Sequence, residues 1–90
     1  MWDPVRPVYE AGRYAEAADM GRALIEARPD QAYLYYNVAC CESLAGRNAD
    51  AVDHLRQAID MWDGCRDMAT GDSDFDAIRD EPAFQDLIGR

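Results

Sequence analysis

The stretch that decides the fold is residues 30 to 59, which reads DQAYLYYNVACCESLAGRNADAVDHLRQAI. On both sides of Gly46, apolar residues recur at steps of three and four, the spacing of one face of an α-helix. Before the glycine these residues are Leu34, Val38, Cys41 and Ala45, widened by Tyr35, Ala39 and Glu42, and after it they are Ala51, Leu55, Ala58 and Ile59. The stretch therefore predicts a helical hairpin.

The ends of these two helices carry ordinary boundary residues. Asp30 is expected to cap the first helix by accepting a bond from an early backbone N–H, and Asn48 is expected to cap the second in the same way. Gly46 is expected to end the first helix, because glycine takes the left-handed conformation without a steric penalty. The connection is short, so the two helices should pack antiparallel.

The segment before residue 30 predicts two further helices. A short one is expected from about Pro4 to Ala11, since proline is tolerated in a first helical turn. After Gly12, the spacing of apolar residues predicts a helix from Tyr14 to Glu26. Gly21 lies inside this helix at a cost of roughly 1 kcal/mol, which indicates close approach of a neighbouring helix.

The segment after Trp62 predicts three short helical elements. Residues 65 to 70 form the first, and Ser73 or Asp74 is expected to cap a single turn that carries Phe75 and Ile78 inward. A final helix is expected with Pro82 in its first turn and a cap at Asp80 or Glu81, and its inward residues are Phe84, Leu87 and Ile88.

The chain also contains an internal repeat. Gly12-Arg13 and Gly46-Arg47 are 34 residues apart, as are Ala17 and Ala51, and this period in paired helices is the signature of tetratricopeptide repeats. The chain resembles that family over about residues 9 to 62. The matching positions of the central unit are Tyr35, Val38, Ala39, Gly46, Ala51, Leu55 and Ala58, and the departures are Glu42, Asn48 and Asp63.

The phrase from Asp74 to Leu87, DFDAIRDEPAFQDL, resembles the closing segment of many bacterial tetratricopeptide proteins. Together the resemblances imply one all-α domain, residues 1 to 90, in which antiparallel helical hairpins stack as a short α-solenoid with a C-terminal capping helix. Residues 4 to 29 would be a truncated first repeat, 30 to 62 the second repeat and 63 to 90 the capping segment.

The family pattern also implies a concave, partner-binding face. Its positions in this chain are Tyr33, Tyr36, Asn37, Cys40 and Ser43 in the second unit, and Trp2, Arg6 and Tyr9 in the first. Tyrosine and tryptophan suit such a face, because they bury large areas while losing little rotamer entropy. The alternative is that these rings pack as core against the first helix and the C-terminal segment.

The net charge of −9 argues against a nucleic-acid binder and against a partner of anionic membranes, because both need a basic surface. It also opposes an acidic peptide, so a neutral, apolar or basic partner is favoured. No apolar run is long enough to span a membrane, and no secretory leader is recognised. The three cysteines are an odd number with no disulfide spacing, so a reducing cytoplasm is expected.

No motif for metal binding or catalysis is recognised in the sequence. Cys40 and Cys41 are adjacent, so on a helix their thiols point about a hundred degrees apart and do not converge on a metal with His54. A calcium loop at residues 72 to 83 is rejected, since Ala77 and Ala83 stand where glycine and glutamate are needed. No nucleophile elbow or phosphate loop is present, so we expect no metal, no cofactor and no enzyme activity.

These observations predict a non-catalytic protein–protein interaction module, a scaffold or adaptor that binds a protein or peptide on its concave face. Two alternatives stay open. One is a self-association element that forms a homodimer, and the other is a helical domain appended to, or docking on, a larger enzyme.

Overall fold

A computed structural model describes residues 4–89 of the chain, and these residues form helices without any strand. The predicted all-α fold class is therefore confirmed. The α-helices are α1 (Arg6–Glu10), α2 (Tyr14–Ala27), α3 (Ala32–Leu44), α4 (Asn48–Met61), α5 (Gly64–Gly71) and α6 (Pro82–Ile88), and a 3-10 helix, η1 (Ser73–Ile78), lies between the last two.

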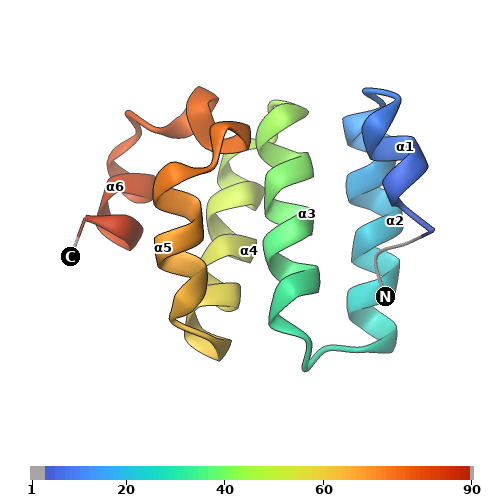
Figure 1. Ribbon diagram of the computed structural model, residues 1–90, viewed down its shortest axis with the longest axis horizontal. Coiled ribbons are helices and arrows are strands. Elements are labelled where there is room, and N and C mark those ends of the chain that lie inside the picture. Colours follow the sequence, from blue (N-terminus) through green and yellow to red (C-terminus); the bar gives the residue numbers. More distant parts are fainter. Residues whose placement is uncertain (1–3, 90) are drawn as a thin grey trace.

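The helices lie side by side in chain order, with α1 and α2 at one end of the molecule and α6 at the other (Figure 1). Helix α3 is central and contacts α2 on one side and α4 on the other. Short connections reverse the chain, so these neighbours run antiparallel. After α5 the chain turns back, and η1 packs against α3. That this arrangement is a tetratricopeptide-like solenoid stays a prediction.

The apolar residues of α3 face several directions, and the helix is accordingly buried on nearly all sides, at residues 34–36 and 38–43. One cluster of buried side chains lies between α1, α2 and α3 and includes Val5, Ala17 and Cys41. The larger cluster lies between α3, α4 and the C-terminal segment, and its members include Tyr36, Leu55, Ile59, Phe75 and Phe84. Helix α3 thus separates two halves of the core.

Two turns of the chain are closed in the same way. Gly12 and Gly46 both have φ near +81°, the left-handed region that glycine adopts at a helix end. In the first turn the N–H of Arg13 donates to the Val8 carbonyl at 3.1 Å, and in the second the N–H of Arg47 donates to the Glu42 carbonyl at 2.8 Å. The predicted glycine ends are confirmed, and the two turns repeat at the 34-residue spacing of the sequence.

Two predicted caps are wrong. Gln31, not Asp30, precedes α3, and Arg47, not Asn48, precedes α4; neither makes a side-chain capping bond. Asn48 is instead the first residue of α4, and its Nδ2 donates to Glu81 Oε2 at 2.8 Å. A tertiary contact with the start of α6 therefore takes the side chain that a local rule assigned to capping.

The C-terminal segment closes one end of the core. Phe75, Ile78 and Phe84 are fully buried, as predicted, and the rings of Phe75 and Phe84 have centroids 5.5 Å apart. The predicted cap of the short turn is displaced by one residue, because Asp72 Oδ1 accepts from the backbone N–H of Asp74 at 3.0 Å. Helix α6 begins at Pro82, also as predicted.

Candidate interaction surfaces

The tyrosine face expected to be open is largely covered by the chain itself. Tyr36, Cys40 and Ser43 are only 6%, 5% and 2% exposed, and Asp72 at the start of η1 contacts the first two. The expectation that these three side chains line an open face is therefore wrong, and for Tyr36 the alternative of a core ring is correct. The reason is that η1 packs on this side of α3.

The remaining predicted binding residues are distributed unevenly. Tyr33, in the first turn of α3, is 43% exposed, and Arg6 on α1 is also exposed. Asn37 and Tyr9 are half-buried. Trp2 lies outside the described residues.

Two aspartates hold the C-terminal segment against the tyrosines. The hydroxyl of Tyr36 donates to Asp72 Oδ2 at 2.7 Å, and the thiol of Cys40 lies 3.8 Å from the same oxygen. The hydroxyl of Tyr9 donates to Asp74 Oδ2 at 2.6 Å, across 65 positions of sequence. These bonds join α1, α3 and η1, so the first and last parts of the chain meet on one face of α3.

Burial and the aspartates set the protonation of this cluster. Burial, followed by the hydrogen bond to Asp72, raises the pKa of Tyr36 far above its ordinary value. Burial and Asp74 raise the pKa of Tyr9 in the same direction, and burial with Asp72 raises the pKa of the Cys40 thiol. All three groups therefore remain protonated near neutral pH, as hydrogen-bond donation to a carboxylate requires.

One group of side chains in this cluster has the composition of a metal site. A ligand atom from each of Cys40, Asp72 and Asp74 lies within 4.8 Å of the others. Both carboxylates, however, already accept hydrogen bonds from Tyr36 and Tyr9. The arrangement works as a protonated hydrogen-bond network that joins helices.

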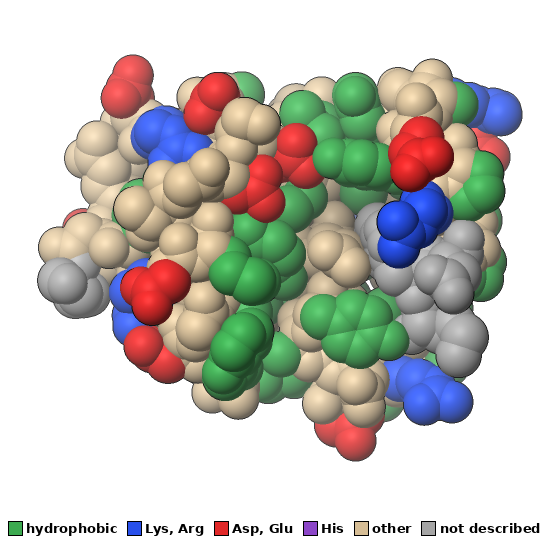
Figure 2. All heavy atoms as spheres, in the orientation of Figure 1, with side chains coloured by type: hydrophobic (Ala, Val, Ile, Leu, Met, Phe, Trp, Pro, Cys, Tyr) green, Lys and Arg blue, Asp and Glu red, His purple; other side chains and the backbone are tan. Residues whose placement is uncertain are grey.

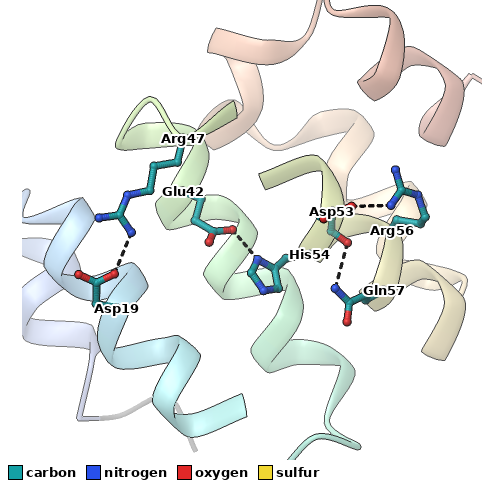
Figure 3. A network of polar contacts seen from close by, with 7 residues as sticks. All are labelled: Asp19, Glu42, Arg47, Asp53, His54, Arg56 and Gln57. Carbon is teal, nitrogen blue, oxygen red and sulfur yellow. Dashed lines mark hydrogen bonds and ion pairs between the residues drawn. The ribbon is translucent and has the colours of Figure 1, made fainter. Parts of the chain in front are cut away.

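A second buried polar contact joins α3 to α4. The Glu42 side chain is fully buried, and its Oε1 lies 2.6 Å from Nδ1 of His54, a ring that is 16% exposed (Figure 3). The hydrogen bond to Glu42 is the main cause that raises the pKa of His54 above its ordinary value. Glu42 Oε2 has no hydrogen-bond partner among the described residues. The contact gives Glu42, one of the departures from the tetratricopeptide pattern, a polar partner inside the fold.

A separate surface of the molecule exposes large apolar side chains. Tyr33 is 43% exposed, Met61 43%, Trp62 58% and Met68 41%. The first turn of α3 and the junction of α4 with α5 both lie along the lower edge of the molecule in Figure 1. Figure 2 shows hydrophobic side chains gathered along the seam between α3 and α5 on this face.

Sequence reasoning missed Met61, Trp62 and Met68 as candidate binding residues. A signal was present, because Trp62-Asp63-Gly64 is the point at which the repeat pattern ends. A large ring at the end of the repeat pattern has no apolar position of that pattern to pack against. It is left at the surface unless a later element covers it.

No family model, no curated protein and no solved structure matches this chain. Within residues 4–89 there is no detectable pocket. None of the helices described here has the length and apolar character needed to cross a membrane.

Proposed function

We propose that this chain is a non-catalytic interaction module, a tetratricopeptide-like helical scaffold or adaptor that binds a protein or peptide. The observation that carries the proposal is the exposure of Trp62, at 58%, together with that of Met61 and Met68. Aromatic residues and methionine are enriched in protein interfaces, and tryptophan is prominent among the residues that dominate binding energy.

The helical framework supports the same function. The turns at Gly12 and Gly46 share one conformation and one hydrogen-bond pattern, 34 residues apart. Arrays of helix pairs with this period present extended side-chain surfaces rather than enclosed active sites. The net charge of −9 favours a neutral, apolar or basic partner over an acidic one.

Selection of peptides from a random phage-displayed library on the immobilised chain tests this function. We expect enrichment of peptides that contain aromatic or aliphatic residues, and binding of the synthetic peptides in solution. A library that shows no enrichment over a bare surface contradicts the proposal. A heat-denatured sample of the same chain is the control, because it carries the same charge without the folded surface.

Self-association is the second candidate, and the same exposed side chains favour it. Two copies that pair through Met61, Trp62 and Met68 would cover these residues in a symmetric interface. Light scattering over a range of concentrations measures the mass in solution. A dimer that Trp62→Asp dissociates supports this candidate, whereas a monomer at every concentration contradicts it and leaves the surface available to another partner.

A further inference from the structure

The ring of Trp62 is exposed, yet part of it lies against the chain. Trp62 ends α4 with an extended backbone, φ −152° and ψ 111°, and its ring folds over the backbone of Gly64 at the start of α5. A Cβ atom added at Gly64 would overlap three carbons of that ring. The glycine therefore provides the flat seat on which the ring lies.

The helix that begins at Gly64 carries a second exposed apolar side chain. Met68 follows Gly64 by four positions in α5, and residues four apart lie on the same face of a helix. Met61 is the last residue of α4, directly before Trp62. We call Met61, Trp62 and Met68 the Trp62 surface, and all three side chains are more than 40% exposed.

Acidic residues are the immediate sequence neighbours of the Trp62 surface. Asp60, Asp63 and Asp67 are all exposed. Asp63 pairs with Arg66, whose Nε also donates to the Leu87 carbonyl at 2.8 Å. The side-chain carboxylates of Asp60 and Asp67, by contrast, make no hydrogen bond or ion pair with any residue between 4 and 89. Figure 2 shows acidic side chains over α5 beside the hydrophobic seam.

We infer that the Trp62 surface, with Asp60 and Asp67, binds a peptide segment that carries lysine or arginine next to apolar residues. The inference rests on the proposed function and names its site and the chemistry of its partner. A tryptophan side chain has few rotatable bonds, so it loses little conformational entropy on binding. Two unpaired carboxylates favour basic side chains, and the exposed face of an indole attracts a cation as well.

Two synthetic amphipathic peptides of equal length test the charge preference. One combines leucine with lysine and the other combines leucine with glutamate in the same pattern, so that only the charge differs. Fluorescence anisotropy of the labelled peptides measures binding to the full chain. We expect the lysine peptide to bind at least tenfold more tightly. Equal affinity for the two peptides, or no binding of either, overturns the inference.

Two variants of the tryptophan and its glycine test the location, each with its helical circular dichroism and melting curve checked first. Trp62→Ala should weaken binding of the lysine peptide about 30-fold, the effect of losing a dominant interface residue. Gly64→Ala keeps the tryptophan but removes its seat, and it should weaken binding about 2- to 12-fold, because the ring must then be ordered on binding.

Gly71→Ala is the matched control in the same helix. A Cβ at Gly71 meets no atom within 4 Å, so binding should stay within about twofold of the parent chain. The double variant Asp60→Asn/Asp67→Asn keeps the ring and its seat, and it should reduce the preference for the lysine peptide. This variant keeps the test decisive should Gly64→Ala not fold.

The outcomes separate this inference from the proposed function. Binding of the lysine peptide that is unchanged by both Trp62→Ala and the double aspartate variant overturns the Trp62 surface as the site. If library-selected peptides still bind those variants, the chain remains an interaction module that uses another surface. A library that yields no binder at all contradicts both.

Discussion

Two aromatic surfaces of this protein differ in how they are covered. Tyr36 lies beneath η1, donates its hydroxyl to Asp72 and is 6% exposed. Trp62 also has aspartates close by in the sequence, yet it is 58% exposed, and its ring lies against Gly64. Aromatic rings with acidic neighbours therefore have opposite environments within one small domain.

The two surfaces differ in which segment of the chain carries the aspartates. Asp72 and Asp74 belong to a later segment that also carries Phe75, and the ring of Phe75 packs against Tyr36 with centroids 5.7 Å apart. Asp60 and Asp67 lie on α4 and α5, on either side of Trp62 in the sequence, and the ring stays 58% exposed. A segment that is hydrogen-bonded to an aromatic surface covers it when the segment also buries apolar side chains. Apolar burial supplies most of the free energy that holds such a segment in place.

Truncation of the two rings should show the largest contrast. Phe75→Ala should lower the free energy of unfolding by about 3–5 kcal/mol, because it opens a cavity at a fully buried site. Trp62→Ala should lower it by less than about 1 kcal/mol, since most of that ring is already in solvent. Urea unfolding followed by circular dichroism measures both. Equal losses would mean that the two surfaces do not differ as described.

Removal of one hydroxyl sharpens the comparison on the covered side. Tyr36→Phe keeps the ring and deletes the donor to Asp72, so the free energy of unfolding should fall by about 1.5–3 kcal/mol, the range for a bond to a charged group. Tyr14→Phe is the control, because Tyr14 is half-buried and its hydroxyl makes no hydrogen bond with residues 4–89. Similar unfolding curves for the two variants would show that the Asp72 bond is not stabilising.

The contact between Glu42 and His54 should make stability depend on pH. The pKa of His54 is raised in the folded protein, chiefly by Glu42 of α3, while burial and, to a smaller extent, Arg22 of α2 oppose the shift. The contribution is therefore complete below the unfolded pKa of about 6.5 and is lost as the pH rises through the folded pKa. Urea unfolding should give lower stability at about pH 8 than at about pH 6.

His54→Gln is the control for this pH dependence, because it removes the titrating group from the pair. The decline in stability between the two pH values should be smaller in the variant. An identical decline in both proteins would assign it to other groups. Helicity at each pH should be measured alongside, so that a change of structure is distinguished from a change of stability.

Replacement of aspartate by asparagine should change the free energy of unfolding least at the Trp62 surface. Asp60→Asn/Asp67→Asn should alter the free energy of unfolding by no more than about 0.5 kcal/mol, because both side chains are exposed and unpaired within residues 4–89. Asp72→Asn should destabilise the chain, since Asp72 accepts from Tyr36 and from the Asp74 backbone. Comparable effects of the two changes would contradict the distinction between the surfaces.

Local signals in the sequence predicted the helices well. Gly12 and Gly46 end helices because their backbone requires positive φ, which depends only on the residue and its immediate neighbours. The inward positions of Phe75, Ile78 and Phe84 followed from their spacing in the same way. Capping was predicted less well, because Asn48 is a good local cap whose side chain bonds to Glu81, 33 residues later.

The candidate sites depended more on contacts between distant residues. Tyr36 and Cys40 have the spacing of an open helix face, and nothing near them in the sequence shows that Asp72 will bond to both. In the sequence, Glu42 is only a departure from the repeat pattern. The fold places it against His54 on the next helix. Exposure of a side chain is decided by every segment that packs near it, so a local pattern predicts it poorly.

The amino-acid sequence by itself therefore determined the all-α class, the hairpin around Gly46 and the apolar face of each helix, because helix periodicity and glycine conformation are properties of neighbouring residues. Only the tertiary structure decided which aromatic face is covered and which is open. The physical reason is that η1 must bury Phe75 and Ile78 and does so against α3, whereas no described segment packs over the Trp62 surface in the same way.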